Sequence, residues 1–470
     1  MKSFSRWRVI LTILPALLLT TACNKQAFLD AKPSTNLVVP TTLSDFQALL
    51  DNDLVMGLTP VLGDISADNY YVTYPFWQSL DTKAANAYIW AKDIYEGQVQ
   101  VPDWDIPYQQ VFYANVVLDG LANMKGDSVN TVQFNTIKGE ALFTRSYAFF
   151  NIAELFAPPY DSATATLSNT GIPLRLSSNI NTPTVRSTIQ QTYDTLLGDL
   201  QESVRLLPPS IPFANNNRPS RPAAQALLAR IYLSLRNYAQ AGAYADSALQ
   251  AYSRLIDYSS GVGVDTTMGI PFTKQNIEII YQSNIVSYAQ TEPVLGLYYS
   301  SSRIDSGLLG SYDPNDIRRP AFYKTSATSG FTYLKGGYSG NIFPFTGLAT
   351  DELYLIRAEC SARAGRITNA MNDVDSLLVH RWVAGTFPGY TVSSQAEALD
   401  TILLERRKEL PFRGVRWSDL RRLNQEGRYD TLTRNLNGII YTLMPNSDLY
   451  TLPIPPDVLA LSGIPDDIRN

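Results

Sequence analysis

Apolar residues recur through much of the chain at the three-to-four-residue spacing of an amphipathic helix. This spacing predicts helices over residues 43–50, 108–124, 134–156 and 187–207, the first with a Ser or Thr cap. The segment 134–156 is apolar over most of its circumference. Such a helix is expected to be buried on several sides.

Two further segments, 219–253 and 350–382, have the pattern of helix hairpins. In the first, small and aromatic residues occupy the places of a tetratricopeptide unit: Ala226, Ala229, Tyr232, Tyr238, Ala241, Ala245 and Ala248. In the second, Ala358 takes the place of Ala229, Ala370 that of Ala241 and Leu377 that of Ala248. Alanine at a helix crossing lets two backbones approach closely. Two units are too few for an open solenoid, so the other helices are expected to supply further layers.

The helical pattern breaks between the two hairpins. Residues 255–349 are rich in Gly, Ser, Thr and Tyr, with strand-like pieces such as 278–282. We therefore predict a mainly α fold, in which tetratricopeptide-like hairpins form a scaffold and a loop-rich subdomain carries short β-strands. The predicted boundaries are a helical region at 41–254, a loop-rich insert at 255–349 and a second helical region at 350–470.

The first residues have the features of a secretory signal. Lys2, Arg6 and Arg8 precede an apolar core at 9–19 that is too short for a mature membrane helix. Small residues then lead to Cys23. This pattern favours a lipoprotein signal over residues 1–22, acylation of Cys23 and an extended tether over 23–40. The alternative is an ordinary signal peptide with a chance cysteine.

The composition and net charge indicate a globular protein and disfavour nucleic acid as a partner. The chain is 45% hydrophobic and 17% charged, which suits a full globular core. Its net charge is −5, and removal of residues 1–22 would take away three positive charges and leave −8. Such a charge gives no long-range attraction for nucleic acid. No second apolar run approaches the length of a membrane helix, so acyl chains would be the anchor.

Few residues are suited to catalysis or metal binding. His380 is the single histidine, which excludes a His-rich zinc site, and its place at a helix end favours a capping role. Cys360 is expected to be a small buried thiol rather than a reactive one. Phosphate-binding loops and the Gly-x-Ser-x-Gly elbow are absent from the sequence. We expect no cofactor, no metal and no enzymatic activity, with a glycan hydrolase as the less favoured alternative.

Two charged segments are better explained as structural. The segment 313–319 lacks the glycine and distal glutamate of a calcium loop, which favours a turn whose aspartates pair with its arginines. The segment 405–422 carries six arginines and one lysine. Its acids lie three to four residues from its bases, which indicates ion pairs along helix faces rather than nucleic-acid binding.

Several of these segments together resemble the SusD/RagB family of outer-membrane lipoproteins of Bacteroidetes. The residues that carry the resemblance are Gly139-Glu140-Ala141 with Arg145, Asp313-Pro314 with Arg318, Asp351 to Glu359, Glu405 to Arg422, and Leu452-Pro453-Ile454-Pro455. The chain departs from the family at Arg413, where a Glu is usual, and in its ending, Pro465 to Asn470. The resemblance spans nearly all of the chain after the signal.

The resemblance implies a lipid-anchored, surface-exposed binding protein of the outer membrane. Such a protein would bind an oligo- or polysaccharide, or a peptide in some members, and deliver it to a SusC-like TonB-dependent transporter. It would be non-catalytic. A helical-repeat protein with only a protein partner is the remaining alternative.

The family's ligand residues vary, so the ligand-binding candidates come from side-chain chemistry. Tyr and Trp combine an apolar face with a polar edge, which suits stacking on sugar rings or contact with peptides. The candidates are Asn69, Tyr71, Tyr74 and Trp77, with Trp90, Tyr298 and Tyr299 as weaker ones. Core packing is the alternative for each of them.

Overall fold

The computed structural model describes residues 40–286, 301–428 and 431–469. Cys23, Tyr298 and Tyr299 lie outside the described residues. The helices and strands of the described residues all belong to the unit Thr41–Asn470.

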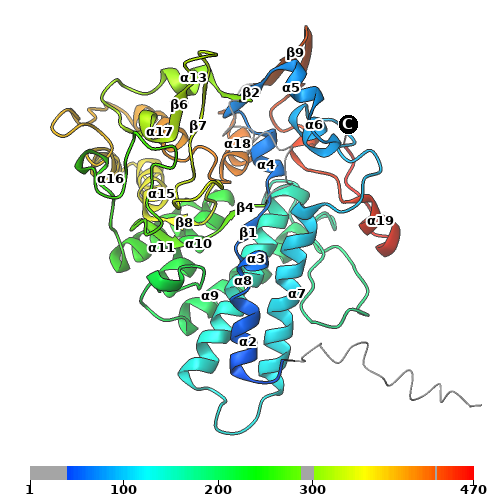
Figure 1. Cartoon of the computed structure of the whole chain (residues 1–470). Helices are drawn as coiled ribbons and strands as arrows, with labels where there is room; N and C mark the ends of the chain where they lie inside the picture. The colour runs from blue at the N-terminus through cyan, green and yellow to red at the C-terminus, as the bar shows by residue number, and fades with distance from the viewer. Residues whose placement is uncertain (1–39, 287–300, 429–430, 470) are drawn as a thin grey trace, which may run out of the picture. The chain divides into compact units, whose positions relative to one another are not determined.

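Four helices at one end of this unit pack side by side (Figure 1). They are α2 (Leu43–Leu50), α7 (Pro102–Asn123), α8 (Val132–Phe156) and α9 (Ile189–Leu206), close to the predicted ranges. Thr42 and Asp45 form a capping box at the start of α2. Helix α7 begins six residues before the predicted start and contains Pro107. A proline inside a helix lacks the N–H group that would donate a hydrogen bond to the preceding turn. Pro107 lies in the second turn of α7.

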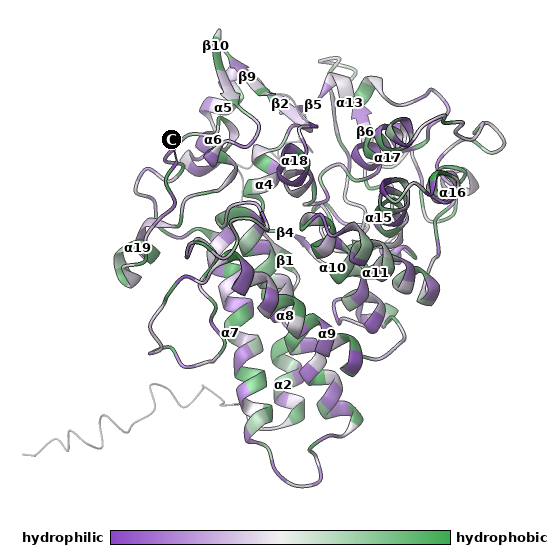
Figure 2. Cartoon of the chain, turned by 180° about the vertical axis from the view of Figure 1, so that it is seen from behind, coloured by the Kyte–Doolittle hydropathy of each residue, from purple (hydrophilic) through white to green (hydrophobic). Residues whose placement is uncertain are grey.

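Helix α8 is buried on most of its circumference, as its sequence predicts. Figure 2 shows many apolar residues along α8 and its neighbour α7. Arg145 is one of several buried polar residues of α8, and it joins this helix to two others. Its guanidinium bonds to Asp199 of α9 at 2.7 Å and to Asn115 of α7 at 2.9 Å.

Both predicted hairpins are present. The first is α10 (Arg221–Ser234) with α11 (Tyr238–Ala251), and the second is α15 (Thr350–Arg363) with α16 (Ile367–Leu378). Their crossing alanines are fully buried, and α11 packs directly on α15. A Cβ on Gly242 of α11 would lie only 2.9 Å from the Cβ of Cys360 of α15. The close approach expected of a tetratricopeptide-like crossing is therefore present.

The strands of the described residues form five two-stranded pairs. β1 (Leu58–Thr59) runs parallel to β4 (Asn284–Ile285). The antiparallel pairs are β2 (Tyr70–Val72) with β5 (Ser302–Ile304), β3 (Ile279–Tyr281) with β8 (Leu348–Ala349), β6 (Tyr323–Thr325) with β7 (Thr332–Leu334), and β9 (Leu432–Leu436) with β10 (Ile439–Leu443). Several pairs join segments that are far apart in the sequence. The fold is mainly helical with short strands, as predicted.

The remaining elements are short or lie in the second helical region. The longer ones are α6 (Thr82–Tyr88), α17 (Gln395–Glu409), α18 (Arg416–Asn424) and α19 (Pro456–Ser462). The shorter ones are α3 (Asp53–Met56), α4 (Leu62–Ser66), α5 (Tyr74–Gln78), η1 (Phe213–Asn215), η2 (Tyr258–Ser260), α13 (Ser306–Gly310), α14 (Arg318–Phe322) and η4 (Asp448–Tyr450).

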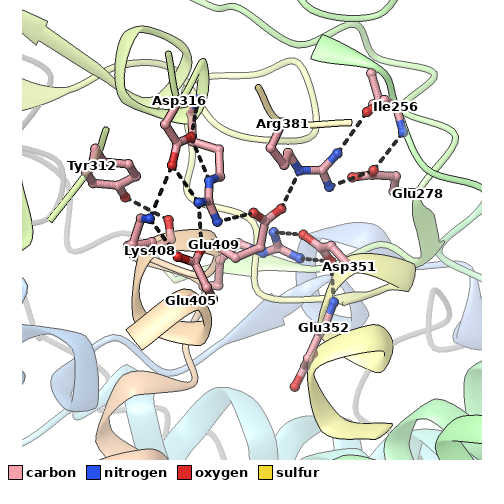
Figure 3. Close-up of polar contacts among 12 residues, drawn as sticks. Ile256, Glu278, Tyr312, Asp316, Asp351, Glu352, Arg381, Glu405, Lys408 and Glu409 are labelled. Atoms are coloured by element: carbon pink, nitrogen blue, oxygen red, sulfur yellow. Dashed lines mark hydrogen bonds and ion pairs between the residues drawn. The ribbon is translucent and has the colours of Figure 1, made fainter. Parts of the chain in front are cut away.

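A buried charge network joins the loop-rich segment to α17. Arg318 is fully buried and bonds to Asp316 and Glu405 at 2.6 Å each and to Glu409 at 3.0 Å. Arg381, also fully buried, bonds to Glu409 and Glu278 at 2.8 Å each (Figure 3). Within 405–422, Lys408 pairs with Glu405 at 2.7 Å and Arg422 with Asp419 at 2.8 Å, each over three residues. The predicted ion pairs of this segment, and the turn in which Asp316 pairs with Arg318, are therefore confirmed.

Three further residues that the sequence singles out are His380, Cys360 and Arg413. His380 Nδ1 lies 2.8 Å from the carbonyl oxygen of Ser376 in the last turn of α16, which fits the predicted capping role. Cys360 is buried, and burial raises the pKa of its thiol to about 12. Arg413, where the resemblance leads one to expect Glu, pairs with Asp351 at 3.0 Å. The departure from the family pattern therefore has its own ion pair in this chain.

Candidate ligand-binding surface

The strand β2 and the helix α5 carry three of the candidate aromatic residues. Along β2, Tyr70 and Val72 point into the core, whereas Tyr71 between them is 40% exposed. This alternation follows from the two-residue period of a strand. Thr73 then caps α5, its hydroxyl accepting a hydrogen bond from the amide of Phe76. The cap starts the helix at Tyr74, directly beyond the strand.

Tyr74 and Trp77 form a stacked pair on α5. Their ring centroids lie 5.8 Å apart with an interplanar angle of 25°, and both side chains are partly exposed. The indole N–H of Trp77 donates to the carbonyl of Ala85 at 2.9 Å. The amide of Gln78 donates to the Tyr74 hydroxyl at 3.0 Å. Both rings are thus held in place while part of each remains accessible.

The partner strand β5 adds a cation, and the residue before β7 adds a further ring. Arg303 of β5 is the register partner of Tyr71, so both side chains lie on the same outward face. The guanidinium carbon of Arg303 lies 3.3 Å from the ring centroid of Phe331, which is 37% exposed. Figures 1 and 2 both place β2 and α5 at the end of the unit opposite α2. We call Tyr71, Tyr74, Trp77, Arg303 and Phe331 the aromatic surface.

Partly buried ion pairs fix the backbone beneath this surface. Asp68, two residues before β2, bonds to Arg416 of α18 at 2.6 Å and to Arg407 of α17 at 3.2 Å. Burial alone would raise the pKa of the Asp68 carboxyl, but the charges of Arg416 and Arg407 outweigh it and hold the pKa well below its usual range. Asp68 is therefore ionised at neutral pH and anchors β2 to the second helical region.

The other described candidates lie inside the protein. Trp90 is 4% exposed, and its indole N–H donates to the carbonyl of Ser66 at 2.9 Å. Asn69 is 1% exposed, and its backbone carbonyl accepts a hydrogen bond from the backbone amide of Asp305 at 2.9 Å. Both belong to the core that supports the aromatic surface. Nothing in the local sequence separates Trp90 from Trp77, because burial depends on what packs around each ring.

Arg303 and Phe331 are not among the residues that the sequence indicates. Arg303 comes beside Tyr71 only through the pairing of β2 with β5, which are more than 200 residues apart in the sequence. Phe331 directly precedes β7, which packs near β5. The residues next to each strand do not indicate which distant short strand it pairs with or in which register.

The described residues provide no constellation for metal chemistry. Among residues 40–286, 301–428 and 431–469, no group of three or more His, Cys, Asp or Glu side chains is placed to hold a metal ion. Within the same residues, no helix combines the length and apolar character that a membrane span requires.

Family models match two long parts of the chain. A model described as starch-binding and associating with the outer membrane, of the SusD-like group, matches residues 27–233. The SusD family model, which includes RagB, matches residues 340–460. Together they cover about seven-tenths of the sequence.

The chain belongs to the SusD/RagB family. The predicted membership is therefore confirmed.

Solved structures of SusD proteins share the fold over almost their whole length. A SusD superfamily protein from Bacteroides thetaiotaomicron is 22% identical, with a TM-score of 0.73 over 91% of this chain and 100% of the other. A SusD-like carbohydrate-binding protein from Bacteroides vulgatus is 19% identical, with a TM-score of 0.66 over 90% of this chain and 97% of the other. A laminarin-binding SusD-like protein is 18% identical, with a TM-score of 0.63 over 91% of this chain and 99% of the other. No curated protein sequence matches the chain.

Proposed function

We propose that this SusD/RagB protein binds a nutrient glycan at the cell surface and delivers it to a SusC-like TonB-dependent transporter. The observation that carries the proposal is the aromatic surface on a SusD fold. Tyr71, Tyr74 and Trp77 are the ligand-binding residues we propose, with the stacked pair on α5 at the centre. Partly exposed rings that hydrogen bonds hold in place can receive the apolar face of a sugar ring with little loss of conformational entropy.

The first test uses the chain from residue 24 onward, which contains the unit Thr41–Asn470. Plant, fungal and host polysaccharides and peptide digests are titrated, and binding is followed by calorimetry and tryptophan fluorescence. We expect saturable binding of a glycan without release of product. Product formation would instead support a glycan hydrolase, and binding of peptides alone would support the RagB-like alternative.

Two variants localise the site. Tyr71→Ala and Trp77→Ala each remove a ring from the aromatic surface, and a central aromatic anchor typically contributes about 2 kcal/mol or more to binding. We expect the Kd to rise by roughly tenfold or more. Phe213→Ala is the matched control, because Phe213 is 53% exposed but lies in η1, outside the surface. Equal losses in all three variants would refute the assignment.

The anchor and the transporter are tested in the native membrane. Cys23→Ser is expected to abolish incorporation of labelled fatty acid and to release the protein from the outer-membrane fraction. Purification of the wild-type lipoprotein in mild detergent is expected to bring down a TonB-dependent transporter, identified by mass spectrometry. A Cys23→Ser protein that still carries label and stays in the membrane would refute lipidation at this residue.

A further inference from the structure

We propose that the glycan bound at the aromatic surface is acidic, and that Arg303 binds its carboxylate or sulfate groups. This inference rests on the proposed function and names the substrate class of the same site. The observations that carry it are the position of Arg303 beside Tyr71, its stacking on Phe331 and the lack of a carboxylate partner for its guanidinium among the described residues.

The register of β2 and β5 determines which way Arg303 points. The flanking register pairs, Tyr70 with Ile304 and Val72 with Ser302, are all buried. Alternation along both strands therefore places Tyr71 and Arg303 together on the outer face. Directly opposed side chains in an antiparallel pair have Cβ atoms about 5 Å apart. One sugar unit can therefore contact the Tyr71 ring and the Arg303 guanidinium at the same time.

Phe331 packs against the guanidinium of Arg303. A guanidinium carbon 3.3 Å from a ring centroid stacks one face of the group on the ring. The N–H edge is the part that forms paired hydrogen bonds to a carboxylate or sulfate. The Arg303 side chain is partly exposed, whereas its Nε is covered and has no hydrogen-bond partner within the described part of the chain. The guanidinium is therefore not fully paired within the described residues, and the ligand group we propose would approach the exposed part of the side chain.

No acid of the described residues forms an ion pair with Arg303. The nearest acid along β5, Asp305, accepts the amide of Leu308 at 2.9 Å and pairs with Arg407 at 3.2 Å. Asp68 is paired with Arg416 and Arg407. These carboxylates around the surface are thus engaged elsewhere, and the charge of Arg303 is left for a ligand.

The overall charge of the protein sharpens this inference. At a net −5, or −8 without residues 1–22, the chain as a whole repels a polyanion at long range. Binding of an acidic glycan must then depend on local contacts, and Arg303 supplies a cation on the same side as Tyr71. Loss of its charge should therefore remove most of the affinity for an acidic ligand.

The test compares matched acidic and neutral polysaccharides. The pairs are polygalacturonate with its fully methyl-esterified form, for a carboxylate, and dextran sulfate with dextran, for a sulfate. We expect the wild-type chain from residue 24 onward to bind an acidic member at least tenfold more tightly than its neutral counterpart. Arg303→Gln should remove this preference, and Arg303→Lys should restore only part of it, because an ammonium lacks the paired geometry of a guanidinium.

Arg319→Gln is the matched control, because Arg319 is exposed on α14 and does not belong to the aromatic surface. It should bind as the wild type does. Equal affinity of wild type and Arg303→Gln for the acidic ligands, or equal affinity of the wild type for the acidic and neutral members, would overturn the inference. So would Arg303-dependent binding of acidic peptides without binding of any acidic glycan.

The failure of this inference is distinguishable from that of the proposed function. Binding of a neutral glycan that is lost in Trp77→Ala but unchanged in Arg303→Gln would overturn the acidic class and leave the glycan function intact. Absence of binding to any acidic or neutral polysaccharide would overturn both.

Discussion

Arg318 offers a direct test of what holds the second helical region to the loop-rich segment. Its guanidinium contacts three carboxylates, those of Asp316, Glu405 and Glu409, and its side chain is fully buried. Arg318→Leu keeps much of the volume but removes the positive charge. Removal of one partner from a buried ion pair typically costs about 3–5 kcal/mol, because the remaining charge stays buried without compensation. We expect a loss of this size in the free energy of unfolding.

The expected change in melting temperature is small despite that cost. Unfolding entropy is about 2.1 cal/mol/K per residue, so a unit of 430 residues has about 0.9 kcal/mol/K. A loss of about 4 kcal/mol then lowers Tm by roughly 4–5 °C. Calorimetry resolves such a shift. Urea unfolding at 25 °C supplies the free energy independently.

The pH dependence separates loss of charge from loss of packing. Burial raises the pKa of Glu405, but the charges of Arg318 and Lys408 outweigh it and lower the pKa to about 2. A carboxyl with a depressed pKa stabilises the fold above its unfolded pKa, near 4.3, and loses that contribution as pH falls toward 2. The deficit of Arg318→Leu should therefore be full above about pH 5 and shrink toward pH 3.

The control for this experiment is Arg205→Leu. The Arg205 side chain is 73% exposed and pairs with Glu202 on the helix surface, so its removal should change the free energy of unfolding by less than about 1 kcal/mol. If Arg318→Leu melts within 1 °C of the wild type at pH 7, charge pairing does not stabilise this network and the reasoning fails.

Three further predictions address the core. Burial raises the pKa of the Asp64 carboxyl to about 7, so this group's contribution to stability is lost as pH rises from about 4 to 7. Asp64→Asn should lack this contribution and lose less stability than the wild type between pH 4 and pH 8. Urea unfolding at the two pH values would refute the idea if both proteins changed alike. Cys360, with its raised pKa, should resist thiol reagents in the native protein and react fully in denaturant, as absorbance of the released thiolate would record. Gly242→Ala should lower the free energy of unfolding by about 1–3 kcal/mol, because the added methyl group would contact Cys360. Gly198→Ala is the control, since a Cβ there would have no atom within 4 Å, and it should be neutral or stabilising in the same melting assay.

Helices and hairpins of this protein were predictable because their signals are local. Apolar periodicity placed α2, α8 and α9 within two residues of their observed ends. The alanines of α10, α11, α15 and α16 marked the crossings, because only small side chains let two backbones approach so closely. The charge pattern of 405–422 indicated ion pairs, although it could not reveal that Arg318 and Glu278 from the loop-rich segment complete them.

The ligand surface was predictable only in part. The sequence by itself supplied Tyr71, Tyr74 and Trp77 as candidates, but it ranked Asn69 beside them and could not tell that Trp90 lies in the core. The tertiary structure alone decided which rings are exposed and brought Arg303 and Phe331 to the same surface. The physical reason is that exposure and strand register depend on contacts between segments hundreds of residues apart, whereas helix formation depends on residues within a few turns of one another.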